Sequence, residues 1–447
     1  MRTKIKSRFD SKKTNHGLLV MKNEKITKIL HADKSKIDLV ASRLIKQYNF
    51  VTARESDVIY HFNGKIYDSK NTTSIIKEES EKQIISCTMT DRNEVINKIK
   101  SRTYQDLKDF DSDPFLFTLE NGILNIQRMR LTPHTSKNLS KILIPCNFYP
   151  PKSNSFDKTL FCKYLNSSFT INDKIDKENI QTVLEMMASV FVRKPIDEKS
   201  FIMLGSGENG KSVLLDYLAK IIGVDNVSHI PLQVLSDDKF ASSRLEAKLA
   251  NIFSDLEKNE LRHTGIIKDL SSGEPIHVQM KNQNGFDLRP FASLIFSTNR
   301  FPKVFDQSQG FFRRWMIIQW LRNFENDPER DNNLKEKLLS NRREMDVVFS
   351  HLMFITKELY KNNKFTYSKD WKIIQKMWNE SADPVNDFIE NYIIDSDNSK
   401  TKRETYQFYK STMYSLGTSP LGMGQFSKAF SEFYEESKTN ESRVWLN

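Results

Sequence analysis

The stretch Ser200–Ser212, SFIMLGSGENGKS, decides the fold of this chain of 447 residues. Its first five residues are mostly apolar and predict a strand, and apolar residues at helical spacing follow over 212–222. The letters between them satisfy the pattern GxxxxGK[ST], in which glycines let backbone N–H groups wrap around a phosphate chain. A strand, a glycine-rich loop and a helix in this order predict an α/β domain with a phosphate-binding loop.

The roles within this loop follow from the chemistry of a nucleoside triphosphate. Lys211 is expected to reach the β- and γ-phosphates, and the hydroxyl of Ser212 is expected to hold Mg²⁺. The alternative, a purely structural glycine loop, explains neither the lysine nor the strand and helix on either side. The residues expected to bind ATP are Gly205, Ser206, Gly207, Glu208, Asn209, Gly210, Lys211 and Ser212.

Hydrolysis needs a carboxylate at the end of a neighbouring buried strand, because that group fixes the Mg²⁺ shell and organises the attacking water. The run LANIFSD ends in such a residue, Asp255. Glu257 lies two residues later and is a candidate catalytic base, although an acidic residue just beyond a strand is more often a solvated turn residue. We therefore expect Asp255 to bind the metal, with the base still to be identified.

A third apolar strand, SLIFST at 293–298, is followed by Asn299. A neutral amide at the carboxyl end of a strand beside the phosphate loop can hold the attacking water or sense the γ-phosphate without adding charge. The alternative is that Asn299 merely opens the turn before Pro302. Three strands that are each followed by residues suited to ATP hydrolysis predict one catalytic site at a single edge of a sheet.

Residues 276–288 alternate apolar and polar side chains on either side of the turn sequence NQNG. This pattern predicts a β-hairpin whose tip presents Lys281 and Asn282. Such a tip can hold nucleic-acid phosphates without reading bases, so we expect contact with DNA here. The alternative is a hairpin at a sheet edge with a polar tip.

The stretch GFFRRW at 310–315 places two guanidiniums among large aromatic rings. Successive residues of a regular backbone point in different directions, so Arg313 and Arg314 are not expected to share one pocket. One is expected to be structural and the other to be presented outward, with a slight preference for Arg313. An arginine delivered by a neighbouring subunit would stabilise the charge of a transferring phosphoryl group.

The composition is that of a folded, basic protein. Hydrophobic residues make up 38% of the chain, the net charge is +11 and the pI is about 9.2, which favours a polyanion as partner. The cysteines, Cys87, Cys146 and Cys162, lie far apart without a CxxC spacing and predict neither a disulfide framework nor a zinc site. We find no apolar run long enough to cross a membrane and no secretory signal at the start of the sequence.

Changes in composition and periodicity divide the chain into five expected regions. The mixed region near the start contains an amphipathic segment at Ile37–Tyr48 and a hairpin at Val58–Tyr67 with an Asn-Gly turn. The regions are a basic arm at 1–36, a mixed α+β domain at 37–194, a P-loop ATPase core at 195–323, a helical extension at 324–383 and a winged-helix-like domain at 384–447.

The last of these regions shows patterns for helices that are followed by a strand containing RVW at 443–445. This order favours a winged helix, in which Gln425–Phe430 would open the recognition helix and Lys428 would face DNA. The alternative is a small helical cap on the preceding domain.

These motifs, in this order, resemble those of the superfamily III DNA helicases, and within them the phage and plasmid primase-helicase proteins. The resemblance rests on GSGENGKS, NIFSDLE, IKDLSSGEPIHVQMK, LIFSTN and GFFRRW, and more loosely on ENGILNI at 120–126. It implies an AAA+-like domain with Lys211 and Ser212 as Walker A residues, Asp255 as Walker B acid and Asn299 as sensor. Two departures stand out: Ser254 occupies a position where many relatives carry a second acid, and Lys281-Asn282 replaces a basic–aromatic pair found in some.

The resemblance implies an ATP- and Mg²⁺-dependent replicative DNA helicase of a virus, plasmid or mobile element. It would act as a ring, usually a hexamer, on single- or double-stranded DNA, with a separate primase as a further candidate partner and no membrane. The expected location is the cytoplasm of a prokaryotic host or of a virus-infected cell, at the nucleoid. The alternatives are a DNA loader or packaging motor without unwinding, and a non-hydrolysing origin-binding protein that nucleotide only regulates.

Overall fold

The computed structural model of the chain describes residues 36–150, 155–238, 240–256, 260–279, 285–328, 330–393, 401–416, 419–438 and 443–446. The chain divides into two compact units, one formed by Met1–Ser112 with His134–Lys141 and the other by Asp113–Pro133 with Ile142–Asn447. The boundary between these units falls inside the mixed region expected at 37–194. All of the basic arm expected at 1–36, except its last residue, lies outside the described residues.

The first unit is built from short strands and amphipathic helices. A four-stranded sheet of order β3-β2-β1-β4 is formed by β1 (Val51–Ala53), β2 (Val58–Phe62), β3 (Tyr67–Asp68) and β4 (Tyr104–Gln105). Helices cover residues 36–48, α2 (Thr72–Gln83) and α3 (Met89–Thr103), and a 3-10 turn η1 comes next at Leu107–Asp109. Two expectations are confirmed here: the amphipathic segment is helical, and β2 and β3 form an antiparallel hairpin around Asn63–Ile66.

The second unit begins with a sheet of order β7-β6-β5-β8. Its strands are β5 (Leu116–Leu119), β6 (Gly122–Asn125), β7 (Arg130–Thr132) and β8 (Leu143–Ile144), followed by α4 (Leu160–Ser168), the β9–β10 pair (Thr170–Ile171 and Lys174–Ile175) and α5 (Lys177–Ser189). Phe117, Phe161 and Val183 from this segment share one buried core with Phe201 of the next strand. Because that core is continuous, the segment from Asp113 onward belongs to the same compact unit as the glycine-rich loop, across the boundary expected near residue 194.

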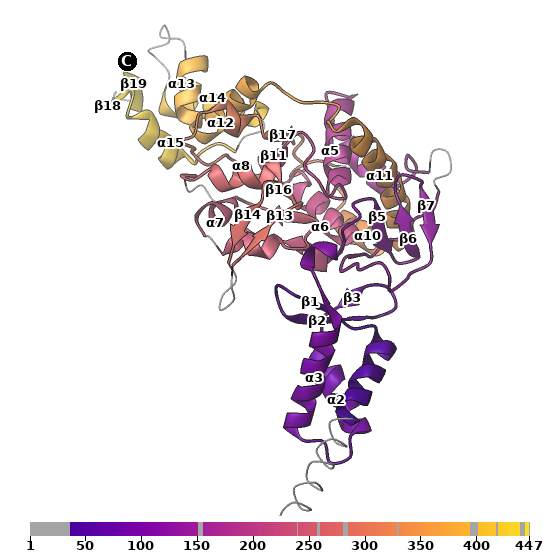
Figure 1. Cartoon of the computed structure of the whole chain (residues 1–447). Coiled ribbons are helices and arrows are strands. Elements are labelled where there is room, and N and C mark those ends of the chain that lie inside the picture. Colours follow the sequence, from indigo (N-terminus) through magenta and orange to yellow (C-terminus); the bar gives the residue numbers. More distant parts are fainter. Residues whose placement is uncertain are drawn as a thin grey trace, which may run out of the picture. The chain divides into compact units, whose positions relative to one another are not determined.

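A five-stranded parallel sheet of order β12-β13-β16-β11-β17 forms the centre of this unit (Figure 1). The strands are β11 (Ser200–Leu204), β12 (Val227–Ser228), β13 (Ala250–Phe253), β16 (Ser293–Thr298) and β17 (Trp315–Gln319). Side chains of β11 alternate between two cores: Phe201 and Met203 face one, and Ile202 and Leu204 face the other. Both faces of the sheet are therefore covered, as in α/β folds.

Helices complete the two cores. The first core contains α6 (Lys211–Ile222), α5 and α11 (Arg342–Asn362), with α5 and α11 packed together (Figure 1). The second core contains α7 (Leu232–Asp237), α8 (Gly265–Ser272), α9 (Gln309–Phe312) and α12 (Trp371–Ala382). The remaining elements are the 3-10 turns η2 (Val224–Asn226) and η3 (Ala241–Leu245), the antiparallel hairpin β14 (Ile276–Val278) with β15 (Phe286–Leu288), and α10 (Leu334–Ser340).

The last elements form a small bundle with its own core. Helices α13 (Pro384–Tyr392), α14 (Lys402–Ser415) and α15 (Met423–Phe430) pack through Phe388, Tyr409, Phe426 and Phe430. An antiparallel pair comes after them, β18 (Glu435–Lys438) with β19 (Arg443–Leu446), of which only the second strand was expected from the sequence. Over the part of the chain that the structure describes, no helix is both long and apolar enough to cross a membrane.

Candidate nucleotide-binding site

The glycine-rich loop lies between β11 and α6, at the carboxyl edge of the sheet. Gly210 caps α6 with a left-handed φ of 89°, which a residue with a side chain adopts only at a cost. Gly205 has no room for a side chain, because an added Cβ would lie 2.3 Å from Asn209 Nδ2 and 2.8 Å from the carbonyl oxygen of Trp320. These two glycines of the motif are therefore required by the backbone of the loop.

Lys211 is buried inside the loop, with 6% of the residue exposed. Its ammonium group donates to Gly205 O at 2.8 Å, to Asn209 Oδ1 at 2.7 Å and to Asn299 Oδ1 at 3.4 Å. Burial lowers the pKa of this ammonium to about 8, although the negative charge of Asp255 acts in the opposite direction. A buried ammonium group surrounded by neutral oxygens attracts an anion strongly, so this lysine is suited to bind a negatively charged group in the cavity.

Two buried side chains hold the loop in place. Asn209 donates through Nδ2 to the carbonyl of Trp320 at 2.9 Å and accepts from Lys211 with its other amide atom. Tyr164, on α4, donates its hydroxyl to the carbonyl of Gly210 at 2.9 Å. Sequence reasoning missed Tyr164, because no motif surrounds it and it lies in a segment that composition alone places in another domain.

The strand-end residues meet beside the loop as the parallel sheet requires. β16 lies between β13 and β11, so Asn299 and Asp255 follow neighbouring strands at the same edge as the loop. Asp255 is exposed and adopts a left-handed φ of 64°, a conformation that aspartate tolerates better than most residues.

A cavity of about 640 Å³ opens at this edge, which is the size of sites for small molecules and cofactors. One side is formed by α4, and the other by residues 324–335, whose Phe324 N–H donates to Glu208 O at 2.9 Å. Arg330 also pairs with the Glu208 carboxylate at 3.0 Å. The cavity is lined by Leu160, Lys163, Tyr164, Ser167, Ser168, Gly207, Glu208, Asn209, Gly210, Lys211, Ser212, Val213, Ser254, Asp255, Ser297, Thr298, Asn299, Phe324, Arg330, Asp331, Asn332, Leu334 and Lys335.

The lining fits Mg²⁺ in the way that a nucleotide-dependent site requires. Ser212 contributes a hydroxyl and Asp255 a carboxylate to the same cavity. Mg²⁺ is usually held by only one or two protein oxygen ligands together with phosphate oxygens and water. Within the described ranges there is no cluster of three or more His, Cys, Asp or Glu side chains arranged to hold a metal by themselves.

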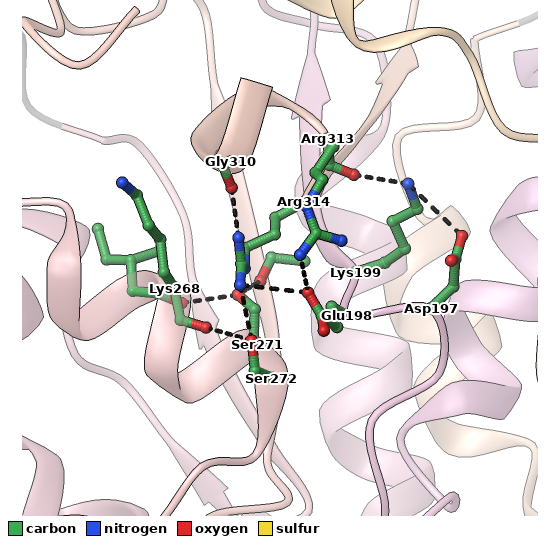
Figure 2. Close-up of polar contacts among 11 residues, drawn as sticks. Asp197, Glu198, Lys199, Lys268, Ser271, Ser272, Gly310, Arg313 and Arg314 are labelled. Carbon is green, nitrogen blue, oxygen red and sulfur yellow. Dashed lines mark hydrogen bonds and ion pairs between the residues drawn. The ribbon is translucent and has the colours of Figure 1, made fainter. Parts of the chain in front are cut away.

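The two arginines of GFFRRW differ in their surroundings (Figure 2). The Arg314 side chain is 12% exposed, donates to Ser272 Oγ at 2.8 Å and to the carbonyl of Gly310, and lies 3.1 Å from the Glu198 carboxylate. The Arg313 side chain is 42% exposed and pairs with the same Glu198. Burial lowers the pKa of the Arg314 guanidinium, against the attraction of Glu198. The sequence offered no signal for Glu198, which is far from both arginines along the chain.

Both arginines lie at the amino edge of the sheet, opposite the phosphate loop. Arg314 immediately precedes β17, and its carbonyl accepts from the N–H of Ser200, the first residue of β11. The loop begins after the last residue of β11, and a five-residue strand spans about 16 Å. Neither arginine is among the described residues that line the cavity, so the sheet separates them from the site of their own chain.

The candidate DNA-contacting residues are only partly described. The hairpin β14–β15 is antiparallel as expected, but its tip with Lys281 and Asn282 lies outside the described residues, and so does Glu257. Lys428 is exposed on the last turn of α15. The structure therefore brings together Lys211, Ser212, Asp255 and Asn299, and it describes Lys428 at a separate place on the small C-terminal bundle.

Family models match consecutive parts of the chain. The model described as "D5 N terminal like" matches residues 22–187, the "Family of unknown function (DUF5906)" matches residues 203–314, and "Poxvirus D5 protein-like" matches residues 380–447. The middle match contains the glycine-rich loop, the strand ends and both arginines of GFFRRW. The order of the matches is the order of the motifs along the chain.

A curated relative is a protein of Acanthamoeba polyphaga mimivirus that is named a putative helicase. It is 22% identical over 367 residues, which cover 77% of this chain but only 37% of that protein, so this chain spans little more than a third of the relative's length. One solved apo structure of the NrS-1 C-terminal region aligns over 91% of this chain and 97% of that chain, with 14% identity and a TM-score of 0.49. The three family models together match most of the chain, which is therefore similar to D5-like proteins at both ends and to a family of unknown function in between.

Proposed function

We propose that this chain is an ATP- and Mg²⁺-dependent DNA helicase that acts in the replication of a virus, plasmid or mobile element. One observation carries the proposal: Lys211 and Ser212 at the start of α6, Asp255 after β13 and Asn299 after β16 line one cavity at the carboxyl edge of a parallel sheet. Ligands of open α/β sheets bind at this edge. A structural glycine loop would not require these side chains to converge.

Each of these residues has a distinct task in hydrolysis. Lys211 binds the β- and γ-phosphates and offsets their charge as the bond to the γ-phosphate breaks. Asn299 and Asp255 orient the attacking water from the neighbouring strands. Bound Mg²⁺ would be held by Ser212 and Asp255 and would neutralise charge on the phosphate oxygens. Asn209 and Tyr164 keep the loop backbone in the conformation that directs its N–H groups inward.

The proposal includes a ring of identical subunits, because both arginines of GFFRRW lie away from the cavity of their own chain. Phosphoryl-transfer enzymes often complete the site with an arginine delivered by a neighbouring molecule. The Arg313 side chain is exposed and lies away from the cavity of its own chain, so a neighbouring molecule can reach it. Arg314 is buried and holds the segment that carries Arg313. We assign Arg313 as the arginine finger.

DNA contacts are proposed at two places. The strands β14 and β15 form an antiparallel pair, and the residues between them, Lys281 and Asn282 among them, are of a type suited to phosphate contacts. The C-terminal helices followed by the β18–β19 pair support the interpretation as a winged-helix-like domain, with Lys428 on the exposed side of α15. The basic net charge of +11 agrees with a nucleic-acid partner.

An unwinding assay on a forked DNA substrate tests the proposal. The wild-type chain should separate the strands only with ATP and Mg²⁺, and a Lys211→Ala variant should not. Lys220→Ala is a suitable control, because Lys220 is an exposed lysine on the same helix. Hydrolysis without unwinding would favour a loader or packaging motor, and nucleotide binding without hydrolysis would favour an origin-binding protein. Unwinding that persists in the Lys211→Ala variant would overturn the mechanism.

A further inference from the structure

The segment that leads into α15 reaches back to the nucleotide site. Ser419 donates its hydroxyl to the carbonyl of Ser206, in the glycine-rich loop, at 2.9 Å. The N–H of Ser419 donates to the carbonyl of Asn299 at 3.3 Å, and its carbonyl accepts from Arg300 Nη2 at 3.1 Å. A single residue of the C-terminal region thus contacts both the phosphate loop and the residue that comes directly after β16.

This segment is also fixed to the core of the C-terminal bundle. The N–H of Leu421 donates to the hydroxyl of Tyr409 at 3.0 Å, and the hydroxyl of Tyr406 donates to the carbonyl of Leu421 at 3.0 Å. Tyr409 is fully buried and stacks on Phe426 of α15, with ring centroids 4.5 Å apart. Leu421 is only two residues from Ser419, so a short stretch of chain joins the core of the bundle to the contact with the glycine-rich loop.

The segment after Asn299 is also held by the C-terminal part of the chain, through contacts with α12. Phe301 stacks on Trp378 of α12 with ring centroids 4.4 Å apart, and Trp378 donates its indole N–H to the carbonyl of Pro302 at 2.9 Å. The N–H of Phe301 donates to Ser381 Oγ at 3.2 Å. The residues just beyond the sensor position are therefore bound to α12, and α12 leads directly into the C-terminal bundle.

We propose that Ser419 is a positioning residue that couples the C-terminal bundle to the nucleotide site. It orients the carbonyl of Ser206 and hence the backbone amides of the phosphate loop, while Arg300 and Asn299 hold its backbone. A ligand that binds the bundle then changes the affinity of the cavity for nucleotide. Nucleotide in the cavity changes the affinity of the bundle for that ligand by the same factor, because coupling between two binding sites is reciprocal. This inference rests on the proposed function only in naming the ligand of the cavity as a nucleotide.

Hydrogen–deuterium exchange of the full-length chain without nucleotide tests the link itself. Ser419→Ala should speed exchange of the amides in 205–210 about two- to tenfold, which is the effect of losing one ordinary hydrogen bond. Ser419→Thr keeps the hydroxyl and should restore exchange to that of the wild type. The control is Ser411→Ala, in which the lost hydroxyl is exposed and bonds only to Phe408 O within α14. Exchange in 205–210 that is the same in Ser419→Ala and wild type would overturn the link.

The coupling is tested by adding a non-hydrolysable ATP analogue to the same proteins. In wild type the analogue should slow exchange in 419–430, and in Ser419→Ala this protection should be reduced while the KM for ATP rises about two- to tenfold with little change in kcat. An unchanged melting temperature would separate this effect from a general loss of structure.

Equal protection of 419–430 in both proteins would overturn the coupling. If the wild-type chain bound no nucleotide, the proposed function would be refuted. The hydrogen–deuterium exchange measured without nucleotide would still decide whether Ser419 holds the glycine-rich loop.

Discussion

Lys211 and Arg313 are cations suited to the same phosphate chain, yet their surroundings are opposite. Lys211 is 6% exposed and hydrogen-bonded inside the cavity at the carboxyl edge of the sheet. The Arg313 side chain is 42% exposed at the amino edge, where it pairs with the carboxylate of Glu198. The difference teaches that one chain contains the cation proposed to bind nucleotide but presents the second cation away from its own cavity. The active site is therefore expected to be shared between copies.

Removing the exposed cation should produce the largest effect. Arg313→Ala is expected to lower the turnover of ATP by about 10³-fold or more, as removal of an arginine finger does. Because Arg313 is exposed, the melting temperature should stay within the range of the wild type. Steady-state hydrolysis at saturating ATP measures this effect. Turnover within a few-fold of the wild type would remove Arg313 from the mechanism and leave the chain with a complete site of its own.

Removing the buried cation should be nearly as damaging, but for a different reason. Lys211→Ala is expected to lower turnover by about 10²- to 10³-fold, since one preorganised group that stabilises developing charge is lost. Nucleotide affinity should fall as well, in contrast to Arg313→Ala, because Lys211 also binds the ground state. Fluorescence titration with a labelled nucleotide distinguishes the two variants. Lys220→Ala, on the same helix, should behave as the wild type.

Arg314 carries the same guanidinium group as Arg313, but its side chain is buried, so its loss should affect the stability of the fold. Arg314→Ala is expected to lower the free energy of unfolding by about 1–3 kcal/mol, since Glu198 and the carbonyl of Gly310 lose a buried partner. Urea unfolding of both single variants measures the contrast. An Arg314→Ala protein as stable as the wild type would show that its contacts contribute nothing to the fold.

The burial of Lys211 also predicts a pH dependence of nucleotide binding. The pKa of Lys211 is lowered to about 8, so the lysine is largely protonated below pH 8 and increasingly neutral above it. Phosphate stabilises the charged form, and binding above pH 8 must therefore take up a proton. Affinity should be nearly constant from about pH 7 to 8 and then fall by up to about tenfold per pH unit. Calorimetry at about pH 7, 8 and 9 in two buffers measures the affinity and the proton uptake, and an affinity that stays constant to pH 9 would contradict the assignment.

The sequence predicted those parts of the site that depend on local patterns. The loop after β11, the strand that ends near Asp255 and the strand before Asn299 can all be inferred from short runs of apolar residues with one polar residue at the end. Because parallel strands place their carboxyl ends at one edge, the convergence of these residues was also predictable.

The parts that the sequence did not predict depend on contacts between distant segments. Tyr164, Glu198 and Ser419 contact the loop or the arginines across long stretches of chain, and none of them belongs to a motif. The core that joins the segments on either side of residue 194 was not predicted for a similar reason. Apolar periodicity shows that Val183 is buried, but it does not show that Val183 shares a core with Phe201.

The shared active site is tested most directly by mixing two inactive variants, Lys211→Ala and Arg313→Ala. In a mixed ring, an Arg313→Ala subunit keeps an intact cavity and receives Arg313 from a Lys211→Ala neighbour. About a quarter of the sites in a random equimolar mixture would be complete, so about a quarter of the wild-type ATP turnover should return. A mixture that forms mixed rings by native mass spectrometry but hydrolyses ATP no faster than the separate variants would contradict the account.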